Sequence, residues 1–214
     1  MSSNAFYHER LRRGPEAMRR VAEFPVMVCG AGALGANIAE GLARQGFARL
    51  RVIDRDRIEE RNLSMQPYFV SEIGGLKAKM LANSIYRAVG VAVDARTDEL
   101  TSGNTAKLLD GSGLVIDAFD NSVARAAVKE HCQARAVPCL HAGLANDYAE
   151  VIWNEVYRIP SAANDDVCDY PLARNLAILT AAVASEVSLR FAIEGKQENY
   201  TITLGDFAVR RFEP

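Results

Sequence analysis

Short apolar runs alternate with longer amphipathic stretches along the first two thirds of the chain. Apolar runs of this length, bounded by glycine, proline and polar residues, are typical of buried strands. They predict strands at 25–29, 50–54, 91–96, 114–117 and 137–141. The stretches between them predict helices. Strands and helices in alternation predict an α/β fold, a Rossmann-like, doubly wound and mainly parallel sheet with helices on both faces.

The pattern changes in the last third of the chain. Residues 149–157 read as an extended strand, 158–170 as a polar crossover loop, and a long Ala/Leu-rich helix is expected from Pro171. Proline is well suited to the first turn of a helix. Two short strands at 200–204 and 207–211 follow, and they predict antiparallel strands at the C-terminal edge of the sheet.

The N-terminal residues are polar and compatible with helices, and Gly14-Pro15 divides them in two. No internal repeat, low-complexity segment or linker interrupts the rest of the chain. We therefore expect an N-terminal helical segment at 1–24 and a single domain at 25–214 that contains the crossover loop.

Composition excludes few classes of protein, but it bears on the expected partners, metal content and cellular compartment. The 214 residues carry a net charge of −2, which gives no reason to expect a nucleic-acid or membrane-surface partner. We find no N-terminal hydrophobic signal and no apolar run that we judge long enough to span a bilayer. None of the four cysteines forms a C-x-x-C pair, so we expect no structural zinc, and Cys29, Cys132 and Cys139 are expected in the core. These features predict a cytoplasmic protein with reduced thiols.

A glycine-rich motif, G-A-G-A-L-G at 30–35, lies between the first expected strand and the helix after it. In that context Gly30 permits a tight turn, Gly32 lets a phosphate approach the backbone, and Gly35 lets the helix pack closely on the strand. Asp54 ends the second expected strand, 19 residues after Gly35, where it can accept hydrogen bonds from a ribose. The motif alone fits an NAD-linked dehydrogenase equally well, and the alternative without a ligand is a plain glycine turn.

Three further motifs separate these interpretations. Residues 54–66 read D-R-D-R-I-E-E-R-N-L-S-M-Q, residues 74–77 read G-G-L-K, and residues 117–125 read D-A-F-D-N-S-V-A-R. Their order and spacing resemble the ThiF/MoeB/HesA and ubiquitin-activating enzyme family, whose motifs are D-x-D-x-[VI]-x-x-x-N-L-x-R-Q, G-x-x-K and D-x-x-D-N-x-x-x-R. The resemblance extends from about Tyr7 through the final strands, and it disfavours the dehydrogenase.

The resemblance implies a site for ATP and Mg²⁺. In it, Asn62 and Lys77 contact phosphates, Asp120 binds the Mg²⁺, and Asn121 and Arg125 support the Asp120 loop. Positive charge suits the chemistry, because attack of a carboxylate on ATP sets one anion against another. The alternatives are a solvated Lys77 and an Asp120 that only caps the following helix. The implied nucleotide-binding set is Gly30, Ala31, Gly32, Leu34, Gly35, Asp54, Asp56, Asn62, Gln66, Lys77, Asn121 and Arg125.

Family members often lend an arginine from the N-terminal segment of one subunit to the ATP site of its partner, from a segment that reads Y-x-R-Q. The corresponding residues here are Y-H-E-R at 7–10. The resemblance therefore implies a homodimer in which Arg10 acts in trans, with Arg13 in reserve. The alternative is an arginine pair on the surface of a helix.

Met65 departs from the family pattern, and the role of Cys168 stays open. Met65 stands where the family has the arginine of N-L-x-R-Q, so one phosphate-binding cation is missing, and Arg57 and Arg61 are the candidate replacements. Cys168 lies in the crossover region, where ubiquitin-activating relatives carry a thioester-forming cysteine and ThiF a persulfide-related one. Its acidic neighbours disfavour a thiolate, so an ordinary loop thiol is the alternative.

The resemblance implies Mg-ATP-dependent adenylyl transfer to a carboxylate. The expected acceptor is the C-terminal glycine of a ubiquitin-like or sulfur-carrier protein that ends in Gly-Gly. Two alternatives stay open: a catalytically impaired partner subunit, which Met65 motivates, and adenylation of a small-molecule or tRNA-linked carboxylate.

Overall fold

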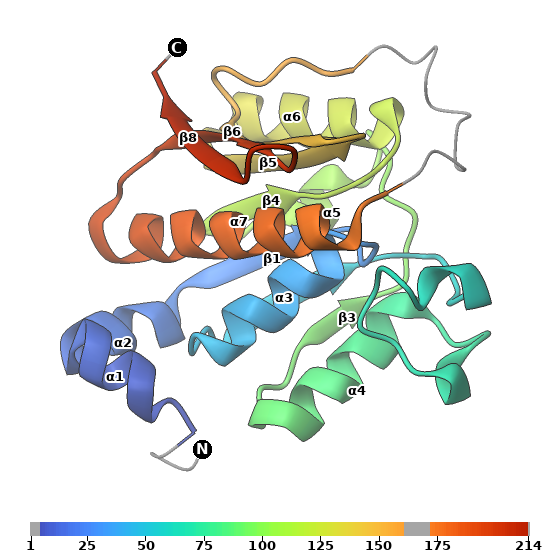
Figure 1. Ribbon diagram of the computed structural model, residues 1–214, viewed down its shortest axis with the longest axis horizontal. Coiled ribbons are helices and arrows are strands. Elements are labelled where there is room, and N and C mark those ends of the chain that lie inside the picture. The colour runs from blue at the N-terminus through green and yellow to red at the C-terminus, as the bar shows by residue number, and fades with distance from the viewer. Residues whose placement is uncertain (1–4, 161–171, 214) are drawn as a thin grey trace.

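The computed structural model describes residues 5–160 and 172–213. Within them, eight strands form one sheet in the order β3-β2-β1-β4-β5-β6-β7-β8 (Figure 1). The strands are β1 (Pro25–Cys29), β2 (Arg49–Ile53), β3 (Asp94–Arg96), β4 (Leu114–Asp117), β5 (Cys139–Ala145), β6 (Tyr148–Trp153), β7 (Asn199–Thr203) and β8 (Ala208–Phe212). The helices are α1 (Tyr7–Arg13), α2 (Pro15–Glu23), α3 (Gly35–Arg44), α4 (Lys77–Val89), α5 (Thr105–Leu109), α6 (Ser122–Arg135) and α7 (Arg174–Glu194), with short 3-10 helices η1 (Glu60–Asn62) and η2 (Val70–Glu72).

The predicted fold class is confirmed. Strands β3, β2, β1, β4 and β5 pair in parallel, and β6, β7 and β8 continue the sheet in antiparallel pairs. The predicted break at Gly14-Pro15 also separates α1 from α2, because Pro15 starts the second helix and Gly14 has a φ of 83°.

Alternate residues of the strands divide the core between the two faces of the sheet. On one face, residues such as Val28, Val52 and Ile116 pack under α3, α4 and α7. On the other face, Cys29 and Val115 pack with α5 and α6. Figure 1 shows α3 and α7 lying side by side across the near face of the sheet. Cys29, Cys132 and Cys139 belong to the second layer, as predicted.

The topology creates a switch point between β1 and β4. From β1 the chain continues to β2 on one side, whereas β4 pairs with β1 on the other. The loops that follow β1 and β4 therefore emerge next to each other at the carboxyl edge of the sheet, where open α/β sheets bind ligands. Both the glycine motif and Asp120 lie in these loops.

Several predicted strand boundaries were wrong, in part because pairing with neighbouring strands sets where a strand begins and ends. The strand expected at 91–96 forms only over Asp94–Arg96, where it pairs with β2 as the sheet edge. The strand expected at 137–141 runs on to Ala145, because its second half pairs with β6. The strand expected at 149–157 ends at Trp153, and Tyr157 follows a turn at 154–156. The long helix is described from Arg174, and Pro171 lies outside the described residues.

The expectation about apolar length also needs correction. Helix α7 has 21 residues and is long and apolar enough, by length and composition alone, to cross a membrane. Half of its most apolar window is buried inside the protein, against α3, β5 and β6 among others. This burial is what a core helix of an α/β sheet needs, because apolar side chains then face both the sheet and the neighbouring helix.

Candidate active site

The glycine loop after β1 is shaped by two close backbone approaches. Gly30 has a φ of 96°, and a Cβ there would lie 2.9 Å from the carbonyl oxygen of Ala118. A Cβ on Gly35 would lie 2.0 Å from the carbonyl oxygen of Gly30. By contrast, a Cβ on Gly32 would meet nothing within 4 Å. The first and third glycines are therefore required by packing, and the space above the second is open to a ligand.

The start of α3 offers hydrogen-bond donors at this open space. The N-cap residue Leu34 has no side-chain oxygen to accept a bond. In the described part of the chain, no acceptor is found for the backbone N–H groups of Gly32, Ala33 and Leu34. Unpaired N–H groups at a helix N-terminus bind anions, and the helix dipole adds to the attraction. The loop thus fits a phosphate group.

Asp54 holds the glycine loop in shape. Its Oδ2 accepts from the N–H of Ala31 at 2.7 Å and its Oδ1 from the N–H of Asp56 at 2.7 Å. Burial raises the pKa of this carboxyl above its usual value, against the two backbone N–H groups and Lys77, which favour the charged form. The predicted contact with a ribose is not tested by these bonds, since each oxygen retains a further lone pair.

Lys77 lies close to Asp54, the carboxyl that holds the glycine loop in shape. Its side chain is only 11% exposed, and its Nζ lies 3.3 Å from Oδ2 of Asp56. The solvated interpretation of Lys77 is therefore wrong. Asp56 is itself exposed, so the ion pair is a weak one that an incoming phosphate can compete with.

Residues 60–66 lie near the glycine loop. There, the side chain of Asn62 makes a local bond that the sequence did not predict. The Asn62 side-chain oxygen accepts from the N–H of Glu59 at 2.9 Å and closes a capping box at η1. Its predicted phosphate contact would have to come from the amide NH₂ group. Gln66 is buried, and its side-chain oxygen has no partner among the described residues.

Asp120 is exposed, and within the described residues its carboxylate has no hydrogen-bond or ion-pair partner. The neighbouring Asn121, not Asp120, caps α6 by accepting from the N–H of Ala124 at 2.8 Å. The interpretation of Asp120 as a cap is therefore wrong. No group of three or more potential metal-ligating side chains occurs in the described ranges. A single carboxylate nevertheless fits Mg²⁺, which binds one or two carboxylates together with phosphates and water.

A buried polar network fixes the turn that carries Asp120. The guanidinium of Arg125 donates to the carbonyl oxygen of Phe119 at 2.6 Å, to that of Ala142 at 2.9 Å, and to the hydroxyl of Tyr157 at 2.8 Å. Arg125 thus bonds to the loop, and its buried guanidinium is occupied by protein partners.

Asp117 completes this network. Its Oδ2 lies 3.5 Å from Arg125 and 2.8 Å from Nδ1 of His141, and its Oδ1 accepts from the N–H of Phe119. Burial opposes the charged carboxylate, but Arg125 and the His141 hydrogen bond outweigh it and hold the pKa of Asp117 below its usual value. His141 is fully buried and stacks on Tyr157 at 3.8 Å. The sequence motif at 117–125 includes Asp117 but assigned it no role, although a carboxylate at the end of a buried strand was the available sign.

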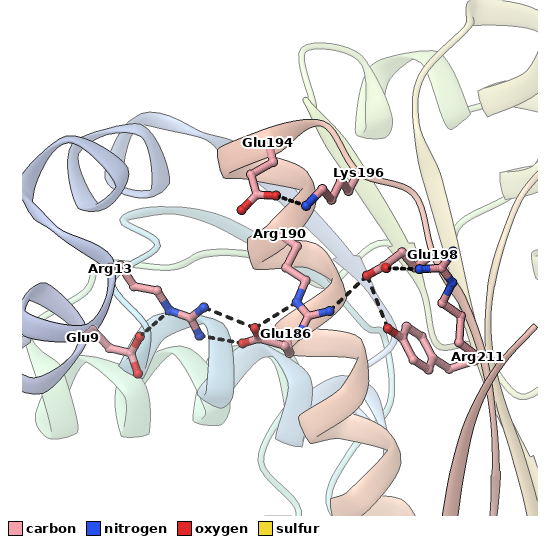
Figure 2. Close-up of polar contacts among 9 residues, drawn as sticks. Glu9, Arg13, Glu186, Arg190, Glu194, Lys196, Glu198 and Arg211 are labelled. Carbon is pink, nitrogen blue, oxygen red and sulfur yellow. Dashed lines mark hydrogen bonds and ion pairs between the residues drawn. The ribbon is translucent and has the colours of Figure 1, made fainter.

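The N-terminal arginines lie away from the glycine loop of their own chain. Figure 2 shows Arg13 donating to both carboxylate oxygens of Glu186 on α7, at 2.6 and 3.2 Å. Glu186 lies about 18 Å along the helix from Arg174, at about 1.5 Å of rise per residue. Arg13, the reserve candidate, is therefore a structural anchor for α1. Arg10 is exposed on the same helix.

The candidate replacements for the arginine missing at Met65 are engaged elsewhere. Arg57 donates to the carbonyl oxygen of Gly74 at 2.6 Å, and Arg61 pairs with Glu59 at 2.6 Å. Arg174, which the sequence analysis missed, donates to the carbonyl oxygen of Ser64 at 3.1 Å. Cys168 lies outside the described residues.

The fold and this site define a doubly wound α/β protein with an open glycine loop and an exposed carboxylate at its switch point. The chain matches the ThiF family over residues 7–187, and it belongs to that family.

Individual relatives agree with this assignment. The sulfur carrier protein adenylyltransferase of Thermus thermophilus is 33% identical over 129 residues, which cover 58% of this chain and 48% of that protein. The tRNA threonylcarbamoyladenosine dehydratase of Escherichia coli is 29% identical over 167 residues, which cover 76% of this chain and 60% of that protein. The crystal structure of E. coli MccB with ATP has the same fold, with a TM-score of 0.82 at 16% identity over 99% of this chain and 72% of that chain. This chain matches about half of the length of the Thermus protein.

Proposed function

We propose that this protein transfers the adenylyl group of ATP to a carboxylate. The observation that supports this best is the placement of two features at one sheet edge. An open glycine loop, whose N–H groups at 32–34 have no acceptor among the described residues, lies beside Lys77. The loop after the adjacent strand carries the exposed carboxylate of Asp120. A loop for phosphate beside a carboxylate for Mg²⁺ is what a Mg-ATP site requires.

In the proposed reaction, a carboxylate oxygen attacks the α-phosphorus of ATP. The bond from that phosphorus to the bridging oxygen breaks, pyrophosphate leaves, and an acyl adenylate remains. Lys77 and the loop N–H groups would stabilise the charge on the α-phosphate. Asp120 would hold Mg²⁺, which neutralises phosphate charge when bound.

The acceptor that we propose is the C-terminal glycine of a sulfur-carrier or ubiquitin-like protein. Support comes from relatives that are named sulfur carrier protein adenylyltransferases, in Thermus thermophilus and also in Bacillus subtilis. We further propose a homodimer. Because α1 lies beside the far half of α7, Arg10 would serve the site of a second copy rather than its own.

A second candidate is a tRNA-linked carboxylate. The E. coli dehydratase, which is named for a modified tRNA nucleoside, matches a longer part of this chain than the Thermus protein does. The partner-subunit alternative predicts that ATP binds without turnover until a second protein is added.

The test is exchange of labelled pyrophosphate into ATP by purified protein and Mg²⁺, with candidate acceptors added one at a time. We expect exchange with a carrier protein that ends in Gly-Gly and none with the same carrier lacking its last glycine. The matched control is Asp120→Asn, which should bring exchange to background. Exchange that needs tRNA would favour the second candidate, and an Asp120→Asn variant as fast as wild type would contradict the proposal.

A further inference from the structure

Arg174 joins the first turn of α7 to the segment that follows β2. Its Nη1 donates to the carbonyl oxygen of Ser64 at 3.1 Å, across 110 positions of sequence. The side chain is exposed, and this neutral carbonyl is its one hydrogen-bond partner among the described residues. A guanidinium has five N–H donors, so most of those of Arg174 have no acceptor among the described residues.

The partner segment lies directly against the glycine loop. The carbonyl oxygen of Met65, next to Ser64, accepts from Nδ2 of Asn37 at 3.2 Å, and the same Nδ2 donates to the carbonyl oxygen of Ala33 at 2.6 Å. Ala33 belongs to the glycine motif. In Figure 1, α3 and α7 begin on the same side of the molecule. The guanidinium of Arg174 is therefore bonded to a segment that Asn37 joins to the glycine motif.

Among the described residues, the charge pattern at the start of α7 is unfavourable without an anion. A helix dipole places partial positive charge at the N-terminus, so a cation in the first turn is destabilising. Arg174 is nevertheless the first residue of a 21-residue helix, whose first turn has no acidic residue and whose N-cap residue, Ala173, has no side-chain acceptor. An anion between this turn and the N-terminus of α3 would turn the repulsion into attraction.

We propose that Arg174 binds the β- and γ-phosphates of ATP and takes the place of the arginine that is missing at Met65. The inference rests on the proposed function and deepens it. Lys77 and the loop N–H groups serve the α-phosphate, whereas the leaving pyrophosphate carries two phosphate groups that a planar guanidinium can contact together. Arg57 and Arg61, the rivals from the sequence, are held by Gly74 and Glu59.

The test compares nucleotides with and without the terminal phosphates. By calorimetry in Mg²⁺, Arg174→Gln should raise the Kd for ATP by about 10- to 100-fold, the range of a charge-assisted hydrogen bond, and leave the Kd for AMP within about twofold. Equal weakening for both nucleotides would assign Arg174 to the α-phosphate and overturn the proposal. Arg57→Gln should change ATP binding less than Arg174→Gln, and the reverse order would also overturn it.

A second variant distinguishes a lost phosphate contact from a structural cause of weaker ATP binding in Arg174→Gln. Met65→Arg combined with Arg174→Gln should return the Kd for ATP to within about threefold of wild type, because the cation is restored from the neighbouring segment. If the double variant unfolds in urea like wild type but its Kd for ATP does not recover, Arg174 does not replace the arginine missing at position 65. A wild-type protein that does not bind ATP at all would refute the proposed function itself, whereas equal ATP binding by wild type and Arg174→Gln would refute this inference alone.

Discussion

Replacing Gly35 with alanine tests the closest backbone contact at the glycine loop. The new Cβ would lie 2.0 Å from the carbonyl oxygen of Gly30, where an ordinary contact begins at 3.4 Å. The loop and helix must therefore separate by about 1.4 Å, and the clashing atom is backbone rather than a flexible side chain. Overpacking of this kind costs about 3 kcal/mol at the upper end of its usual range, and the helix propensity of alanine returns at most about 1 kcal/mol.

We therefore expect Gly35→Ala to lose about 2 kcal/mol of unfolding free energy. With a urea m-value near 2 kcal/mol per molar, the midpoint of urea unfolding should fall by about 1 M. The matched control is Gly32→Ala, whose Cβ meets nothing within 4 Å. It should unfold within about 0.5 kcal/mol of wild type but bind ATP more weakly, since its Cβ takes the space proposed for a phosphate. A Gly35→Ala protein as stable as wild type would refute the packing argument, and a Gly32→Ala protein that binds ATP normally would refute the assignment of the open space.

The buried network and Asp120 give three further predictions. Asp117→Asn should cost about 3 kcal/mol at pH 7, because it leaves Arg125 buried without its counter-charge. Since the folded pKa of Asp117 is lowered, the deficit should be full above about pH 4 and shrink as the pH falls further, and a deficit independent of pH in urea titrations would contradict this. Tyr157→Phe should cost about 1–2 kcal/mol through the lost bond to Arg125, and an unchanged unfolding midpoint would argue against that bond. Asp120→Asn should unfold like wild type but lose the Mg²⁺ dependence of ATP binding, and retained dependence would exclude Asp120 as the ligand.

Local patterns in the sequence predicted most of the fold. The parallel half of the sheet consists of strands and helices that each carry their own pattern of apolar and polar residues. Each strand of β1, β2 and β4 is a short apolar run that ends at a polar or glycine residue, and the helices between them carry their own amphipathic pattern. The extent of β5 was among the boundaries predicted wrongly. Its extension to Ala145 depends on pairing with β6, and antiparallel partners are not visible in the run itself.

The residues of the candidate site likewise divide into those that local sequence predicts and those that depend on tertiary packing. The glycine loop and Asp120 were predictable because a strand end and a motif define them locally. The capping role of Asn62 was not predictable, because Glu59-x-x-Asn62 differs from the usual Ser/Thr-x-x-Glu/Gln pattern of a capping box. The contact of Arg174 with Ser64 was not predictable either, because it joins two segments that only the packing of α7 on α3 brings together.

The most direct test of the central claim follows one oxygen atom. A carrier protein ending in Gly-Gly is labelled with oxygen-18 in its C-terminal carboxylate and incubated with this protein, ATP and Mg²⁺, and the adenylate is then discharged with hydroxylamine. If the carboxylate attacks the α-phosphorus, the AMP released carries one oxygen-18 and pyrophosphate is its co-product. Unlabelled AMP, or ADP and phosphate in its place, would contradict adenylyl transfer at this site.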